Sequence, residues 1–237
     1  MKKKKQSIVD LVLSSVGKKY LMSITGLGLV IFTIAHLSGN LLLLVPDEGT
    51  LFNTYAKGLH DLGILLIVAE VGLVIAFLVH LVIAVQTKLN VHDAREEAYH
   101  APQSTKGGNS KFGFASKNMI LAGAVLGAFV VFHLIHFKFG PSIEEGYVTF
   151  VKGERARDLY QLVIQEFKKP WVVLVYVASM VMLGIHVKHG FWSAFQSLGL
   201  AFPKISKPIY GLGLFIAFAL AAGFIAIPLI IFFGDFI

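Results

Sequence analysis

The sequence predicts an all-α membrane protein with five transmembrane helices. Two observations lead to this prediction. The chain of 237 residues is 56% hydrophobic and only 15% charged, whereas about a quarter of the residues in a soluble domain are charged. The charged residues are also segregated, so that stretches long enough to cross a bilayer are almost free of them.

Five apolar stretches give the expected spans, all within one transmembrane domain over residues 1–237. They lie near 20–45, 60–88, 116–139, 170–197 and 208–234. The first begins at Tyr20 after a basic start, and no convincing small-residue cleavage site follows it. We therefore expect it to remain as a helix and not to be removed as a signal peptide. Helix-breaking prolines stand at or between span ends, at Pro46, Pro170, Pro203 and Pro208.

Lysine and arginine gather in alternate loops, and this distribution predicts the direction of the chain across the membrane. The N-terminal segment and the loops after the second and fourth spans are rich in them: Lys2 to Lys5, Lys18, Lys19, Lys88, Arg95, Lys106, Lys111, Lys117, Lys188, Lys204 and Lys207. On the opposite side, the first loop has only Lys57, and the second balances its basic residues with acidic ones. We therefore expect a cytoplasmic N-terminus and an external C-terminus.

The composition also limits the cofactors and partners. The chain has no cysteine, which excludes iron–sulfur clusters, disulfides and covalently attached c-type haem within it. The net charge of +7 reflects orientation and contact with anionic membrane lipid, so we expect no nucleic-acid partner.

Each of the first four spans carries a histidine well inside its apolar stretch. His36 and His133 lie sixteen and seventeen residues into spans that run outward, about 24–26 Å from the inner face. His80 lies seventeen residues past Gly63 and His186 fifteen past Trp171, in spans that run inward. In a core about 30 Å thick, the first two are therefore near the outer side and the other two near the inner side.

Two histidines at one depth on different helices are able to ligate one haem iron from opposite faces, leaving no position for oxygen. The four histidines thus predict two haem b groups on the order of 15 Å apart, held by a bundle of the first four helices. Packing between helices is one alternative role, although ionisable groups at this depth are costly and usually functional. Zinc is a second alternative, but its ligands converge on one point.

Other titratable residues leave choices open. His136 shares a helix face with His133, and His189 shares one with His186, so the residues alone do not select a ligand within either doublet. Glu70, ten residues before His80, is either a hydrogen-bonded packing group or part of a proton route. The remaining histidines lie at span ends or in the inner loop and are expected to be solvated: His60, His92 and His100.

Short motifs around these histidines resemble those of one family. They are Ser23-Ile-Thr-Gly-Leu, Phe32-Thr-Ile-Ala-His36, Phe77-Leu-Val-His80, Phe132-His133-Leu-Ile-His136 and His186-Val-Lys-His-Gly-Phe-Trp192. They are similar to motifs of the cytochrome b subunit of succinate dehydrogenase/fumarate reductase, in its single-chain, five-helix, dihaem bacterial form. The resemblance covers essentially the whole chain in its order of spans. Its most specific element is His-x-x-x-Gly-[Phe/Leu]-Trp in the fourth span.

The resemblance implies a subunit of respiratory complex II in the bacterial cytoplasmic membrane. Such a subunit anchors a flavoprotein and an iron–sulfur protein on the cytoplasmic face and exchanges electrons with membrane quinone. A quinone site on the outer side of a dihaem anchor resembles that of menaquinone users. Dicarboxylate chemistry belongs to the partner subunits, so this chain carries no catalytic residue for it.

The resemblance also assigns residues. It puts the inner haem on His80 and His186 and the outer haem on His36 and His133, in preference to His189 and His136. Ser23 matches a serine near the inner haem. A basic residue that relatives place after the span-four glycine is not evident here, so the local groups for the haem propionates and surroundings are Lys188, His189 and His136, with Lys88 and Lys117.

The quinone site is marked only by polar groups near the outer haem. They are Asn40, Asn53, His60, Asp61 and His136, with Glu70 as a further proton group. Because quinone reduction takes up two protons, the titratable pair His60–Asp61 is the first candidate. Two other functions stay open: the cytochrome b of a hydrogenase or formate dehydrogenase, and a haem-free transporter or assembly protein.

Overall fold

The computed structural model describes residues 14–93, 118–200 and 202–235. Five of its helices are long and apolar enough to cross a membrane, which confirms the predicted fold class. They are α2 (Ser15–Asn40), extended by the 3₁₀ turn η1 (Leu41–Leu44); α4 (Ile64–Asp93); α6 (Met119–His133), extended by the π-helical segment η2 (Leu134–Lys138); α8 (Pro170–Ser197); and α9 (Pro203–Phe233). Several basic residues used to predict the orientation lie outside the described residues, as does His100: Lys2 to Lys5, Arg95, Lys106, Lys111 and Lys117.

Two helices begin five residues before the spans given above, and both have a local reason. Helix α2 begins at Ser15, before the apolar run, because the Ser14 hydroxyl caps it by accepting a hydrogen bond from the Gly17 N–H at 3.0 Å. Helix α9 begins at Pro203, so Pro208 lies inside the helix and not between spans. Pro203 fits the first helical turn, where its missing N–H costs nothing. Pro208 is only five residues further on, near the helix end, where solvent is able to satisfy a freed carbonyl.

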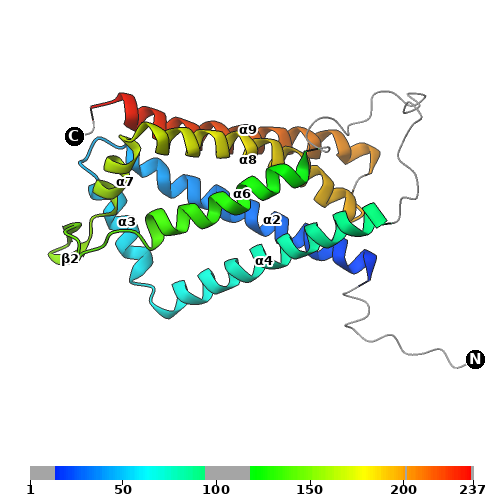
Figure 1. Cartoon of the computed structure of the whole chain (residues 1–237), viewed down its shortest axis with the longest axis horizontal. Coiled ribbons are helices and arrows are strands. Elements are labelled where there is room, and N and C mark those ends of the chain that lie inside the picture. Colours follow the sequence, from blue (N-terminus) through cyan, green and yellow to red (C-terminus); the bar gives the residue numbers. More distant parts are fainter. Residues whose placement is uncertain (1–13, 94–117, 201, 236–237) are drawn as a thin grey trace, which may run out of the picture.

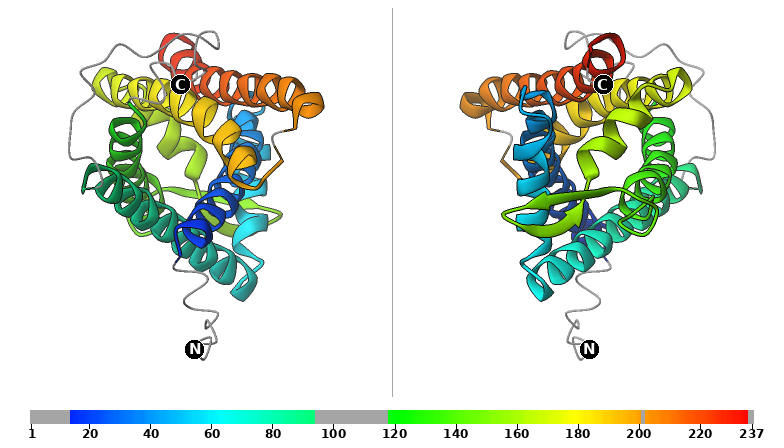
Figure 2. Two further views of the ribbon diagram at one scale, coloured as in Figure 1. Left: turned by 90° about the vertical axis from the view of Figure 1, so that its right-hand side faces the viewer. Right: turned by 90° about the vertical axis from the view of Figure 1, so that its left-hand side faces the viewer.

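Helices α2, α4, α6 and α8 form a ring, and α9 packs outside it against α8 and α2 (Figures 1 and 2). The most extensive helix pair is α8–α9. Small residues bring these two backbones close, since a Cβ added at Gly184 would lie 3.0 Å from the Cβ of Ala221. Helix α4 has the fewest buried residues of the five and touches α6 only sparsely, so it is the most lipid-exposed member of the ring.

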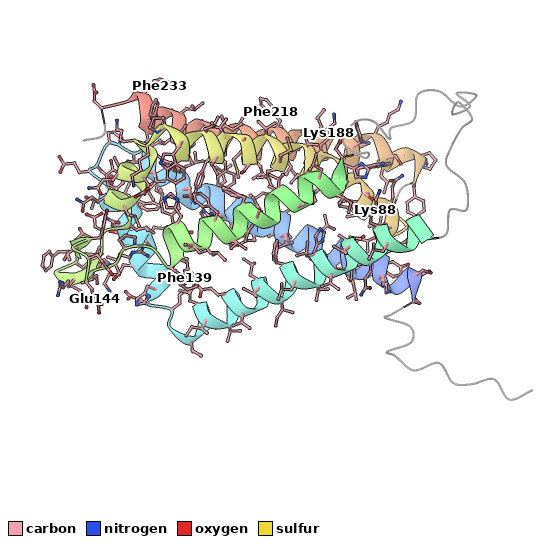
Figure 3. The ribbon with its side chains drawn as sticks, in the orientation of Figure 1. Lys88, Phe139, Glu144, Lys188, Phe218 and Phe233 are labelled. Atoms are coloured by element: carbon pink, nitrogen blue, oxygen red, sulfur yellow. The ribbon has the colours of Figure 1, made fainter. Side chains whose placement is uncertain are left out.

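The two ends of the bundle differ in structure and charge. One end, here called the cap end, carries α3 (Thr50–His60), the antiparallel strands β1 (Val148–Val151) and β2 (Glu154–Arg157), and α7 (Leu159–Phe167) (Figure 1). The opposite end, here called the basic end, carries Lys18, Lys19, Lys88, Lys188, Lys204 and Lys207. Figure 3 labels Lys88 and Lys188 at the basic end and Glu144 at the cap end.

Buried polar contacts and apolar packing hold the cap to the bundle. The Asn53 amide donates to Asp158 at 2.9 Å and accepts from the Tyr160 N–H at 3.0 Å, joining α3 to the start of α7. Gly49 caps the start of α3 with a φ of 81°, and a Cβ there would collide with the Tyr160 ring. Below these contacts is the larger apolar core, whose fully buried members include Leu43, Leu162, Val172 and Ile231.

Candidate functional site: two histidine pairs

The ring of four helices brings its four span histidines together in two pairs. The His36 and His133 rings, from α2 and α6, have centroids 5.8 Å apart. The His80 and His186 rings, from α4 and α8, have centroids 6.3 Å apart. Each pair joins helices on opposite sides of the ring (Figure 2). These are the two pairings expected from the depths of the histidines in the sequence.

Two glycines place the pairs at different depths. Gly26 of α2 lies against His80, where an added Cβ would be 3.1 Å from Cε1, and Gly123 of α6 lies against His186, where the distance would be 3.5 Å. Gly26 lies ten residues before His36 on α2, and Gly123 lies ten residues before His133 on α6. A helix rises about 1.5 Å per residue, so the pairs are roughly 15 Å apart along the bundle. The His36–His133 pair is the cap-end pair and the His80–His186 pair is the basic-end pair.

Hydroxyl groups from neighbouring helices orient one ring of each pair. Nδ1 of His80 lies 3.3 Å from the Thr25 hydroxyl, and that hydroxyl donates its own proton to the Leu21 carbonyl at 2.7 Å. Thr25 therefore accepts from Nδ1–H, which leaves Nε2 of His80 with a free lone pair. Nδ1 of His133 lies 3.1 Å from the Tyr176 hydroxyl. A histidine held at Nδ1 by a neighbouring group is the usual arrangement for binding a metal through Nε2.

The basic-end pair also contains an unsatisfied polar atom. Nδ1 of His186 is buried and, within the part of the chain that the structure describes, makes no hydrogen bond of normal geometry, although the Met119 backbone lies near enough to His186 to interact with it. Because Gly26 and Gly123 have no side chains, the rings of His80 and His186 are able to lie close to the backbones of α2 and α6.

The separation of the rings in each pair is compatible with a haem iron between the two histidines. Two rings that each place a nitrogen about 2 Å from one metal have centroids roughly 6 Å apart, close to both observed separations. Two histidines suffice only where the metal brings its remaining ligands with it, as iron does in a porphyrin.

Beyond the cap-end pair lies a polar network that the sequence did not predict. Nδ1 of His136 lies 3.4 Å from the Tyr176 hydroxyl, and its Nε2 lies 2.9 Å from Oε2 of Glu166 in α7. Lys169 donates to Oε1 of Glu166 at 2.7 Å. Tyr176 reads in sequence as an ordinary aromatic residue of a span, and Glu166 as a loop charge. The only sequence signal was the second histidine of the doublet, His136.

The structure separates the two histidines of each doublet. His133 faces His36, whereas His136, on the π-helical segment η2, turns towards Glu166 and α8. His186 faces His80, and His189 lies one helical turn further towards the basic end, half-buried. The placements match the preference for His133 and His186 that the motifs implied.

The other predicted residues at the basic end are near the pair but do not touch it in described contacts. Ser23 is buried and donates to the Lys19 carbonyl one turn back, two residues before Thr25. Lys188 is exposed. Neither gives the direct ring contact that Thr25 makes with His80.

The predicted quinone and proton residues are scattered over the cap end. Asn40 donates to the His36 carbonyl, and Asn53 is committed to the cap contacts described above. His60 is exposed, and Asp61 is paired with Lys57 at 2.7 Å, so described contacts do not link this pair to the histidine rings. Glu70 lies less than two turns from the start of α4, not deep in the span, and pairs with Lys138 of η2.

No model of a known protein family matches the chain, and no curated protein or solved structure does so either.

Proposed function

We propose that the chain is the dihaem cytochrome b anchor of a succinate:quinone oxidoreductase. In this proposal, His80 and His186 hold the haem nearer the partner subunits, and His36 and His133 hold the haem nearer the quinone. The basic end faces the cytoplasm, where a flavoprotein and an iron–sulfur protein dock. The observation that carries the proposal is the pairing of four span histidines, from four helices, at two depths.

His36 with His133, and His80 with His186, would each hold one haem, which would supply one-electron transfer. The residues of the chain provide the rest. Thr25 and Tyr176 fix the orientation of one ring in each pair through Nδ1. The apolar surfaces around the pairs limit water access, which sets the reduction potentials. The separation of roughly 15 Å would give an electron path across much of the bilayer.

Reduced-minus-oxidised absorption spectra of the purified chain test haem binding directly. We expect a b-type α-band and two haems per chain. His80→Ala should remove the haem of the basic-end pair and spare the other, and His36→Ala should do the reverse. His60→Ala is the matched control, because His60 is exposed and outside both pairs. A chain with no b-type band would contradict the proposal and favour a haem-free transporter or assembly protein.

Co-purification separates the two redox functions. An anchor of succinate dehydrogenase or fumarate reductase should bring down a flavin-containing partner with succinate or fumarate activity. Purification with a hydrogenase or formate dehydrogenase subunit instead would leave the haem assignment intact and overturn the assignment to succinate chemistry.

A further inference from the structure

The cap-end histidine pair is connected to the protein surface by hydrogen bonds. From Nδ1 of His133 the contacts pass to the Tyr176 hydroxyl at 3.1 Å, then to Nδ1 of His136 at 3.4 Å. From Nε2 of His136 they pass to Oε2 of Glu166 at 2.9 Å. The series uses side chains from α6, α8, η2 and α7, so the tertiary fold creates it.

The series runs from a buried to an accessible position. Tyr176 is buried, while the side chains of His136 and Glu166 are each 14% exposed. Lys169, which donates to both carboxylate oxygens of Glu166, has a side chain that is 49% exposed. Glu166 is thus the first carboxylate of the series that lies close to water at the cap end.

The charges around Glu166 keep it ionised. Burial alone would raise the pKa of Glu166, but hydrogen bonds from Lys169 and His136 outweigh that effect and lower the pKa. Within the described residues, the titratable groups that face it are Lys169, at the start of α8, His136 of η2, and Tyr176 further along α8. At neutral pH, Glu166 is therefore a carboxylate hydrogen-bonded to His136, positioned to accept a proton from water or from His136.

We propose that Glu166 exchanges protons with water at the cap end for quinone chemistry near the cap-end pair, and that His136 and Tyr176 form the path between them. This inference depends on the function proposed above. It replaces the His60–Asp61 pair as the proton group, because His60 is exposed and Asp61 is held by Lys57.

The exchange balances protons and electrons. Reduction of one quinone to quinol takes two electrons, which come from the iron–sulfur partner one at a time, and two protons, which come from water at the cap end. Each proton binds Glu166 and passes through His136 and Tyr176 to a quinone oxygen. For each proton that the His136 imidazole receives at one ring nitrogen, it releases one from the other. The Tyr176 hydroxyl receives and releases a proton at its oxygen, so neither side chain changes its net charge. Quinol oxidation runs the same path in reverse.

The test compares Glu166→Gln with Glu144→Gln in the complete complex with its partner subunits. Glu144 is an exposed carboxylate of the same cap end and serves as the matched control. Removing a general acid or base slows a reaction on the order of 10²-fold. We expect Glu166→Gln to slow turnover with a soluble naphthoquinone by about that factor, and Glu144→Gln to leave it unchanged. Small weak acids such as formate should restore part of the rate in Glu166→Gln, because they carry protons in place of the side chain.

A second readout does not depend on turnover. The infrared difference spectrum between oxidised and reduced complex should contain a carboxyl band that disappears in Glu166→Gln and persists in Glu144→Gln. Equal rates in the two variants, loss of rate without rescue by weak acids, or identical infrared spectra would each overturn the inference. Haem spectra distinguish its failure from failure of the proposed function: two haems with an unaffected Glu166→Gln reject the proton path alone, whereas no haem rejects both.

Discussion

At the scale of single residues, the orientation of each histidine in the candidate site depends on what lies beside it. Thr25 and Tyr176 occupy Nδ1 of His80 and His133 and thereby select the nitrogen left free in each ring. Gly26 and Gly123 matter because they have no side chain next to His80 and His186.

Gly26→Val is expected to displace the haem of the basic-end pair, because its side chain would occupy the space next to Cε1 of His80. Haem content should fall from two towards one per chain, with the cap-end haem retained, as measured by redox titration of the α-band. Gly28→Val is the control, since nothing lies within 4 Å of an added Cβ at Gly28. Equal haem loss in both variants would show that the effect is a general one on α2.

Tyr176→Phe tests the orientation of His133. It removes the hydroxyl 3.1 Å from Nδ1 without changing the ring. Outer hydrogen-bond partners of metal ligands typically change affinity by about 10–100-fold when removed. We therefore expect weaker retention of the cap-end haem and an altered midpoint potential, with the basic-end haem unchanged. An unaltered cap-end potential would mean that Tyr176 does not act on His133.

At the scale of elements, the cap is fastened to the end of the third span by Arg157. Its guanidinium donates to the Pro141 and Phe137 carbonyls, each at 2.8 Å, and to the Gly140 carbonyl at 3.2 Å. These carbonyls are at and just beyond the end of η2, where helical hydrogen bonds run out and a positive charge is favourable. Arg157 thereby holds the segment that carries His136.

Arg157→Ala is expected to destabilise the cap end by roughly 1.5–3 kcal/mol, the usual value of hydrogen bonds to a charged group. Arg155→Ala, two residues earlier on the same strand and exposed, should change stability by less than about 0.5 kcal/mol. Thermal unfolding in detergent micelles measures both. Equal melting temperatures for the two variants would contradict the fastening role of Arg157.

The link between α7 and η2 should depend on pH. The pKa of Glu166 is lowered below 4.5 in the folded protein. Its pairing with Lys169 and His136 therefore stabilises the fold fully above about pH 4.5, and this stability is lost as the pH falls through the lower, folded value. The difference in melting temperature between wild type and Glu166→Gln should be present at neutral pH and vanish in acid. A difference independent of pH would indicate a packing effect.

At the scale of the whole molecule, the two ends of the bundle have different chemistry. The described chain begins at the basic end and finishes at the cap end, as five crossings require (Figure 1). Five of the six lysines of the basic end lie in the stretches 14–24 and 186–210, whose described residues include no Asp or Glu, whereas Lys88 is followed by Asp93 at the end of α4. This asymmetry favours a cytoplasmic basic end.

A reporter fused to the C-terminus should therefore be located outside the cytoplasm. Alkaline phosphatase, which folds only in an oxidising compartment, should be active there, and green fluorescent protein should be dark when exported through the general secretory route. Fusion after Lys88, at the end of the second span, should give the opposite pair of results. A fluorescent C-terminal fusion would invert the proposed orientation.

The sequence by itself determined the fold class, the spans to within about five residues, and the two depths of His36, His80, His133 and His186. Those features depend on hydropathy and on the fixed rise of a helix, which are local properties. The tertiary structure decided which member of each histidine doublet faces a partner, and it placed Gly26 beside His80. It also joined Tyr176, His136 and Glu166, which come from three separate segments. Such contacts depend on how helices rotate and pack against one another, and spacing along one chain does not contain that information.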